Sequence, residues 1–255
     1  MRLSSIIAIV TLGLVGCSSA PTHNPTVYPF NINEEVIAEA DVKTVVIAHV
    51  NLGLRSRSYL EKEAKRIDGS VDKYLRKHGY KVLPQREFKQ HWSTAERAFG
   101  NPVDPTTGKI NMKTFAQIMT SVRDQMKDSG LDAFIFTDLQ EQQQSFSNGL
   151  KHLARWDGVN RKPSLQGPGN GVSGDFDWYK QASVASIQIS IYDIELRHLF
   201  TSRGGLDATD AIDTRSSSGR FVRRRNILEN EDHVGEGIAL ALHPFIEMED
   251  WPGNP

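Results

Sequence analysis

The chain has 255 residues, with 30 Lys and Arg, 31 Asp and Glu, and a formal net charge of −1. A polypeptide of this length can bury its own core as one large domain or two small ones, and its near-neutral charge argues against nucleic acid as a partner. A single cysteine excludes an internal disulfide, so the stability of the fold has to come from packing.

The N-terminus combines a positive charge, an apolar run and the only cysteine. Arg2 precedes the apolar residues 6–15, which match the core of a signal peptide and fall short of the roughly 20 residues of a membrane-spanning helix. The run ends in Leu14-Val15-Gly16-Cys17, which resembles the lipobox of bacterial lipoproteins. The resemblance implies cleavage between Gly16 and Cys17, a diacylglycerol on the Cys17 thiol and an acylated new amino terminus. The alternative is an ordinary signal peptide in which Cys17 is incidental.

This interpretation divides the chain into three parts. Residues 1–16 are the predicted signal peptide, residues 17–41 a lipidated N-terminus and flexible tether, and residues 42–250 an α/β periplasmic domain. Because Ser18 follows the cysteine where an Asp would favour inner-membrane retention, the lipoprotein pattern favours the outer membrane.

The first half of the predicted domain alternates strands and helices. Residues 43–50 are apolar on both faces, as in an interior strand. A helix is predicted to begin at Ser58 and to end before Gly79, where a left-handed C-cap is expected. A short strand over residues 80–83 and a short helix over residues 88–99 follow.

The middle of the chain starts with a helix and becomes polar. Asn111 can cap a helix that ends at Gly130, and residues 131–137 read as a second buried strand. Residues 140–148 are polar and are predicted to lie in an excursion, and residues 151–159 read as one strand.

The last third predicts a hairpin and a final helix. Residues 160–178 are rich in Gly, Pro, Ser and Asp and predict a loop. Residues 185–191 alternate apolar and polar side chains, as in a half-exposed antiparallel strand, and residues 199–208 are its expected partner. Asn226 and Glu229 are the expected start of the final helix.

This order predicts an α/β (α+β sandwich) fold: one domain with a mixed sheet, helices packed against it and long surface loops. Four stretches, residues 44–50, 79–88, 130–135 and 189–204, resemble a group of bacterial envelope proteins. The group comprises the curli secretion-channel lipoprotein, the lipoprotein activators of penicillin-binding proteins, and the N-terminal domain of the Tol-system propeller protein. The resemblance implies a domain that binds another envelope protein.

No motif in the sequence specifies a reaction. The G-x-G-x-x-G letters at residues 169–174 lack the strand and helix that nucleotide binding needs, and the S-x-x-K at residues 70–73 lacks its companion Lys-Thr-Gly. The eight histidines contain no His-x-x-x-His pair. Asp207, Asp210 and Asp213 read either as a hard-cation site or as a solvated turn. The sequence therefore predicts no catalytic residue, no metal and no cofactor.

A cluster of arginines is the most unusual charge feature. Arg220, Arg223, Arg224 and Arg225 are the candidate contacts to an acidic partner, to anionic lipid headgroups or to peptidoglycan. The alternative is a basic loop that the following acidic residues partly neutralise.

Together these features predict a non-enzymatic outer-membrane lipoprotein that is attached to the membrane through Cys17. Its periplasmic domain would bind a protein partner in envelope assembly, cell-wall synthesis control or secretion. Two alternatives are an envelope hydrolase acting on cell-wall or lipid substrates and an oligomeric secretion-channel component. Nucleic acid is not an expected partner.

Overall fold

The structure is a computed structural model that describes residues 29–48, 58–104, 107, 109–169, 171–215 and 219–248. The predicted signal peptide, the Gly16–Cys17 cleavage site and most of the predicted tether lie outside these residues.

A six-stranded mixed sheet organises the domain, in the order β1-β9-β8-β4-β2-β3. The contacts of β2 with β3 and β4 are parallel, and the other three contacts are antiparallel. Together with the helices on both of its faces, this sheet confirms the predicted α/β class. The strands are β1 (Phe30–Ile32), β2 (Thr44–Ile47), β3 (Lys81–Leu83), β4 (Ala133–Ser145), β8 (Gln181–Asp193) and β9 (His198–Ala208).

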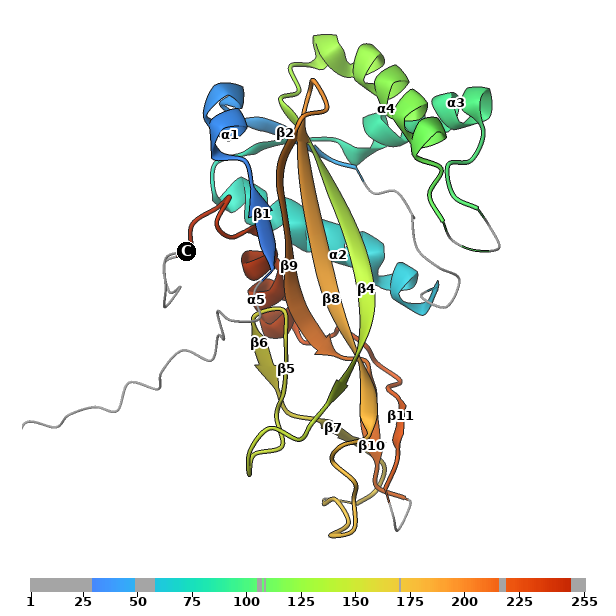
Figure 1. The fold of residues 1–255 in the computed structure, drawn as a ribbon, viewed down its shortest axis with the longest axis vertical. Coiled ribbons are helices and arrows are strands. Elements are labelled where there is room, and N and C mark those ends of the chain that lie inside the picture. The colour runs from blue at the N-terminus through green and yellow to red at the C-terminus, as the bar shows by residue number, and fades with distance from the viewer. Residues whose placement is uncertain are drawn as a thin grey trace, which may run out of the picture.

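Two helix layers cover the sheet because successive strand residues point to opposite faces. Val45 and Ile47 of β2 pack into one core with α2 and α5, while Val46 packs into a second core with α3 and α4. A short helix, α1, and a 3-10 turn, η3, complete this body (Figure 1). The bounds are α1 (Glu34–Ala40), α2 (Ser58–Lys77), α3 (Gln85–Phe99), α4 (Met112–Met126), η3 (Lys127–Ser129) and α5 (Glu231–Leu242).

The polar stretch after the second buried strand is part of that strand. β4 continues to Ser145 and pairs with β8 over its whole length, from Ala133 opposite Asp193 to Ser145 opposite Gln181. Gln143 donates a hydrogen bond of 2.8 Å to the hydroxyl of Ser183 on β8. Such cross-strand side-chain bonds stabilise a polar sheet face. The prediction that residues 140–148 leave the sheet was therefore wrong for residues 140–145.

The far ends of the long strands carry a lower lobe, defined here as residues 146–180 and 209–225, at the opposite end of the molecule from α3 and α4 (Figure 1). It holds one three-stranded sheet, β11-β10-β7, and one hairpin, β5-β6. A separate hydrophobic cluster around Phe146 and Trp156 packs against the ends of β8 and β9 and against Leu240 of α5. The strands are β5 (Ala154–Trp156), β6 (Val159–Arg161), β7 (Ser164–Gln166), β10 (Asp210–Asp213) and β11 (Phe221–Arg223).

The stretch predicted as a single strand over residues 151–159 is a hairpin instead. Asp157 and Gly158 form its two-residue turn, with φ of 38° and 84°. An Asp-Gly pair with positive φ at both positions is the turn that matches the twist of a hairpin. The excursion over residues 160–178 likewise contains a short strand, β7.

Two other boundaries differ from the prediction. The final helix begins at Glu231, with the Asn230 side chain accepting hydrogen bonds from the next turn, rather than at Asn226 or Glu229. Leu228 has a φ of 55° and is fully buried, so the chain turns into the core just before this cap. Residues 30–40, assigned to the tether from sequence, form β1 and α1. Within the described ranges, no helix is both long and apolar enough to cross a membrane.

Candidate interaction surfaces

The four predicted arginines lie on or next to β11, and three of them, Arg220, Arg223 and Arg224, pair with carboxylates. The backbone amide of Arg225 donates a hydrogen bond of 3.1 Å to the side-chain oxygen of Gln166. Arg224 binds Asp207 at 2.7 Å, and Arg223 binds Glu141 of β4 at 3.0 Å and Asp210 at 3.4 Å. Arg223 also lies over the ring of Tyr59, 4.1 Å from its centroid, at the start of α2. These pairs connect the lower lobe to the body of the domain.

Asp213 pairs with Arg220 and with a further arginine, Arg215, two positions along the chain. Its carboxylate is nearly fully buried and accepts hydrogen bonds from the Arg215 side chain at 2.8 Å and from the Arg215 amide at 3.1 Å. Arg220 lies 3.6 Å from the same carboxylate. The Arg215 side chain, then its amide, hold the pKa of Asp213 at about 2. Asp213 is therefore anionic at neutral pH.

The three regularly spaced aspartates are thus partners of arginines. Asp207, Asp210 and Asp213 each accept a guanidinium, which occupies the oxygens that a cation would need. In the part of the chain that the structure describes, no group of three or more His, Cys, Asp or Glu side chains is placed to hold a metal ion. Of the four candidate arginines, Arg220, Arg223 and Arg225 are exposed, and Arg224 is partly buried.

Two hydroxyl–carboxylate pairs lie inside the domain. Ser186 donates to Asp157 at 2.6 Å, and Thr137 donates to Asp68 at 2.7 Å. The Ser186 side chain is fully buried and Thr137 is 5% exposed, so neither hydroxyl faces solvent. These bonds satisfy buried polar groups, as packing requires.

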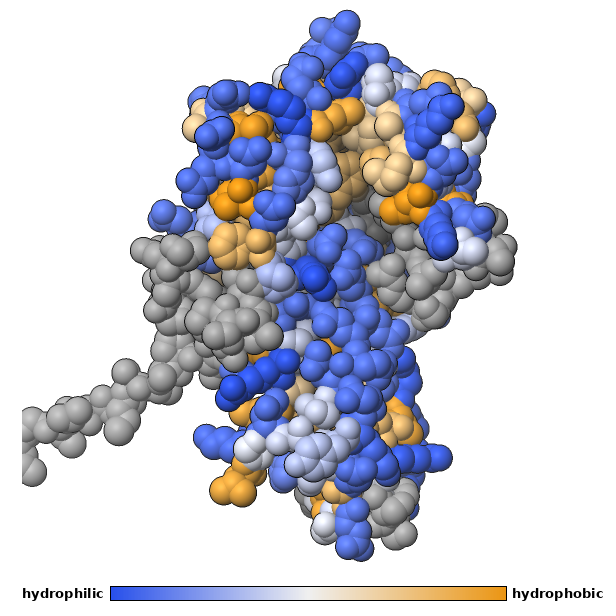
Figure 2. All heavy atoms as spheres, viewed as in Figure 1, coloured by the Kyte–Doolittle hydropathy of each residue, from blue (hydrophilic) through white to orange (hydrophobic). Residues whose placement is uncertain are grey.

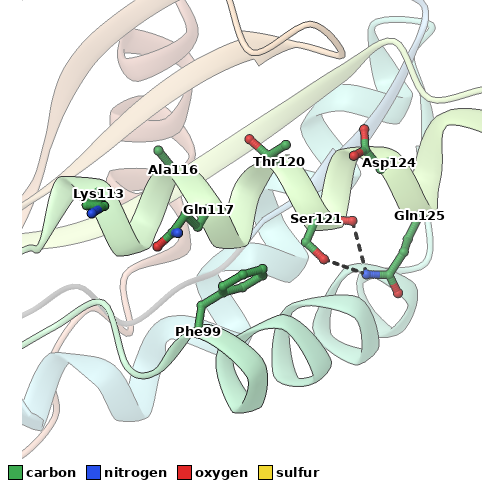
Figure 3. A pocket seen from close by; sticks show the side chains of 8 residues that line it. All are labelled: Phe99, Lys113, Ala116, Gln117, Thr120, Ser121, Asp124 and Gln125. Carbon is green, nitrogen blue, oxygen red and sulfur yellow. Dashed lines mark hydrogen bonds between the residues drawn. The ribbon is translucent and has the colours of Figure 1, made fainter.

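A shallow groove runs along the outer side of the α3–α4 pair. Its volume is about 690 Å³, and its lining is mostly apolar in area. Figure 3 shows the ring of Phe99, at the end of α3, projecting toward α4. The groove is lined by Phe99, Lys113, Ala116, Gln117, Thr120, Ser121, Asp124 and Gln125.

The sequence pattern does not distinguish Phe99 from its buried neighbours. Phe88, Trp92 and Ala95 share its helical face and are buried, whereas Phe99 is 44% exposed. The difference arises because α3 ends at Phe99 and the chain turns away at Gly100 (φ 91°). The ring therefore reaches past the core and forms a wall of the groove.

Hydrogen bonds join two of the polar side chains of the groove, Ser121 and Gln125. The Gln125 side chain donates to the carbonyl and to the hydroxyl of Ser121, both at 3.1 Å, and its oxygen contacts a ring nitrogen of His91 at 2.9 Å. Lys113 lies near the start of α4, and Asp124 lies near its end, where the Arg123 side chain pairs with the Asp124 carboxylate at 2.7 Å. An open, apolar groove of this kind suits the side chains of a protein segment.

Comparisons with known proteins assign no family. No protein-family model, no curated protein and no solved structure matches this chain. Its function has to be inferred from its own residues.

Proposed function

We propose that this protein is an outer-membrane lipoprotein, anchored through Cys17, whose periplasmic domain holds a protein partner in the α3–α4 groove. The observation that carries the proposal is the 44% exposure of Phe99 over a groove with an apolar lining. Exposed aromatic side chains at the edge of a well-packed helix pair are typical anchors of protein interfaces. The lipobox-like ending Leu14–Cys17 supports the anchor.

The partner that fits best is an amphipathic helical segment of another envelope protein. Its apolar side chains would cover Phe99 and pack onto Ala116 and the methyl group of Thr120. An acidic side chain near Lys113 would fix its direction along α4. The groove lies at the end of the molecule opposite the lower lobe (Figure 1), so the arginines are not part of this contact.

Site-specific photocrosslinking in cells tests the proposal. A photoreactive amino acid at Gln117, within the groove, should give a discrete protein adduct, because this side chain lies against the expected partner. The same amino acid at Lys77, an exposed position on α2, is the control and should give no such adduct.

The substitution Phe99→Ser makes the test specific. It removes the exposed ring without opening the core, and it should abolish the adduct from Gln117 while the amount of protein in the membrane fraction stays the same. An adduct of unchanged intensity in the Phe99→Ser protein, or the same adduct from Lys77, would refute the groove as the docking site.

A further inference from the structure

Two loops lie side by side at the end of the lower lobe. The ring of His152 stacks on the ring of Trp178, with 3.6 Å between centroids and an interplanar angle of 8°. Trp178 in turn meets the buried ring of Phe176 at 4.8 Å. These ring contacts hold the loop around residue 150 against the loop around residue 179.

These loops present the two most exposed large apolar side chains among the described residues. Leu150 is 99% exposed and Tyr179 is 78% exposed. Leu150 lies in a tight turn that the bridge between Asn148 and Leu153 closes, so the turn holds it away from the lobe. Leu150 and Tyr179, with Lys151 and Lys180 next to them in the chain, are called the lobe tip below.

The surface charge of the lower lobe is strongly biased. Most of its acidic side chains are shielded from solvent. Asp157 and Asp213 are buried, and Asp210 is partly buried and forms an ion pair with Arg223. The exposed acids are Asp175 and Asp177. The Asp177 carboxylate accepts a hydrogen bond of 3.0 Å from the backbone amide of Tyr179. The exposed basic residues are Lys151, Arg155, Lys162, Lys180, Arg215, Arg220, Arg223 and Arg225. Three of them, Arg215, Arg220 and Arg223, are in ion pairs with Asp213, Asp210 and Glu141.

We propose that the lobe tip is a membrane-contact site that inserts Leu150 and Tyr179 into the surface of an anionic phospholipid bilayer. Transfer of a leucine side chain out of water is favourable in free energy, and a tyrosine places its ring at headgroup depth with its hydroxyl toward water. Lys151 and Lys180 keep their ammonium groups among the headgroups, and the exposed side chains of Arg155, Lys162 and Arg225 add long-range attraction to an anionic surface.

The shape of the tip favours a bilayer over a protein. Leu150 and Tyr179 protrude singly, and Figure 2 shows the lower end of the molecule as mostly hydrophilic with small separate hydrophobic patches. A protein interface of useful affinity needs a contiguous buried core. A bilayer needs only protruding side chains and opposite charge.

This site goes beyond the proposed function and does not depend on the groove. It is compatible with the proposed anchor, because the twelve residue-to-residue steps from Cys17 to Pro29 can span at most about 40 Å and would keep the domain close to the same membrane. The lipid and the lobe tip would then form two attachments to one bilayer.

Vesicle co-sedimentation tests the proposal on the mature chain, residues 17–255, with Cys17→Ser so that no lipid is attached. The protein should bind phosphatidylglycerol-containing vesicles and should not bind phosphatidylcholine vesicles at the same lipid concentration. Leu150→Ser and Tyr179→Ser should each lower the partition coefficient about tenfold. Met112→Ser is the matched control, since Met112 is 66% exposed at the opposite end, and it should bind like the parent.

A fluorescence measurement locates the contact. Because Cys17 is the only cysteine, Leu150→Cys in the Cys17→Ser chain can carry a single polarity-sensitive dye, whose emission should shift to the blue when anionic vesicles are added. An unshifted dye together with unchanged binding of the Leu150→Ser and Tyr179→Ser proteins would overturn the proposal. The proposal would also be overturned if Met112→Ser lost as much vesicle binding as Leu150→Ser and Tyr179→Ser. If either tip substitution removes a protein crosslink in cells and leaves vesicle binding intact, the tip binds a protein and the membrane assignment is wrong. None of these outcomes affects the Phe99 test of the groove.

Discussion

The contact between α5 and β9 is so close that one added methyl group should separate them. A Cβ atom at Gly204 would contact the carbonyl oxygen of Gly237 and would lie 2.8 Å from its carbonyl carbon and 2.9 Å from the nitrogen of Ala241. All three are backbone atoms of α5, so no side chain can rotate to make room. In Gly204→Ala, the helix itself has to move away from the sheet.

The cost follows from what α5 contributes to the core. Val234, Ile238 and Leu242 are almost fully buried against the sheet, and an outward shift of about 0.5–1 Å forfeits a quarter to a half of each contact's attraction. Overpacking typically costs about 1–3 kcal/mol. Because the clash is between the backbones of β9 and α5, we expect a cost at the upper end of this range. Gly204→Ala should therefore lower the free energy of unfolding by about 3 kcal/mol.

Urea unfolding of the mature chain, followed by circular dichroism, measures this change. With a slope of about 3 kcal/mol per molar urea, the midpoint should fall by about 1 M. Gly235→Ala is the control in the same helix: its Cβ meets nothing within 4 Å, so the alanine should stabilise the helix by about 0.5–1 kcal/mol. A midpoint for Gly204→Ala within about 0.2 M of the parent would refute the reasoning, because it would mean that α5 moves without loss.

Three further predictions follow from named contacts. Asp68→Ala should lower the free energy of unfolding by about 2–3 kcal/mol, measured by urea unfolding, because the buried Thr137 hydroxyl loses the acceptor that lies 2.7 Å from it. Arg215→Ala should raise the pKa of Asp213 from about 2 toward its ordinary 3.8, measured by carboxyl NMR titration. Since the folded pKa lies below the unfolded one, this pair stabilises the fold fully above about pH 4, and its contribution is lost as the pH falls toward 2, so the variant should lose less stability over that window. Cys17→Ser should abolish labelling of the protein by a fatty-acid analogue, because the thiol that would carry the lipid is gone, and a labelled Cys17→Ser protein would refute the anchor.

Sequence patterns predicted those helices and strands that depend on capping residues and hydrophobic spacing within a few positions of each other. Ser58 begins α2 and Gly79 follows it with a φ of 88°, as capping chemistry requires. The hydrophobic pattern of residues 43–50 predicted β2, with residues 49 and 50 outside the described part of the chain. The alternation of residues 185–191 predicted β8, which is more buried than the half-exposed strand that was expected. The pattern did not predict that polar residues 140–145 belong to a strand, because their partners are hydroxyl and amide groups of β8 that lie 40 and 48 positions along the chain.

The candidate sites show the same division. The arginine cluster is visible as a run of charge, and the sequence suggests the acids just after it as neutralising partners. In the structure, Asp207, Asp210, Asp213 and Glu141 instead pair with Arg220, Arg223 and Arg224. The exposure of Phe99 and Leu150 depends on where a helix and a turn end in three dimensions, which hydropathy alone does not record.

The sequence by itself determined the class of the fold, the order of its main strands and helices, and the lipobox-like cysteine that motivates the proposed anchor. These follow from spacing, capping and charge within a few residues of each other. Only the tertiary structure decided which charges cancel, which aromatic side chains stay exposed, and that Gly204 and Gly237 let a helix touch a strand. Each of these depends on atoms that folding brings together from distant parts of the chain, and no local pattern of residues contains that information.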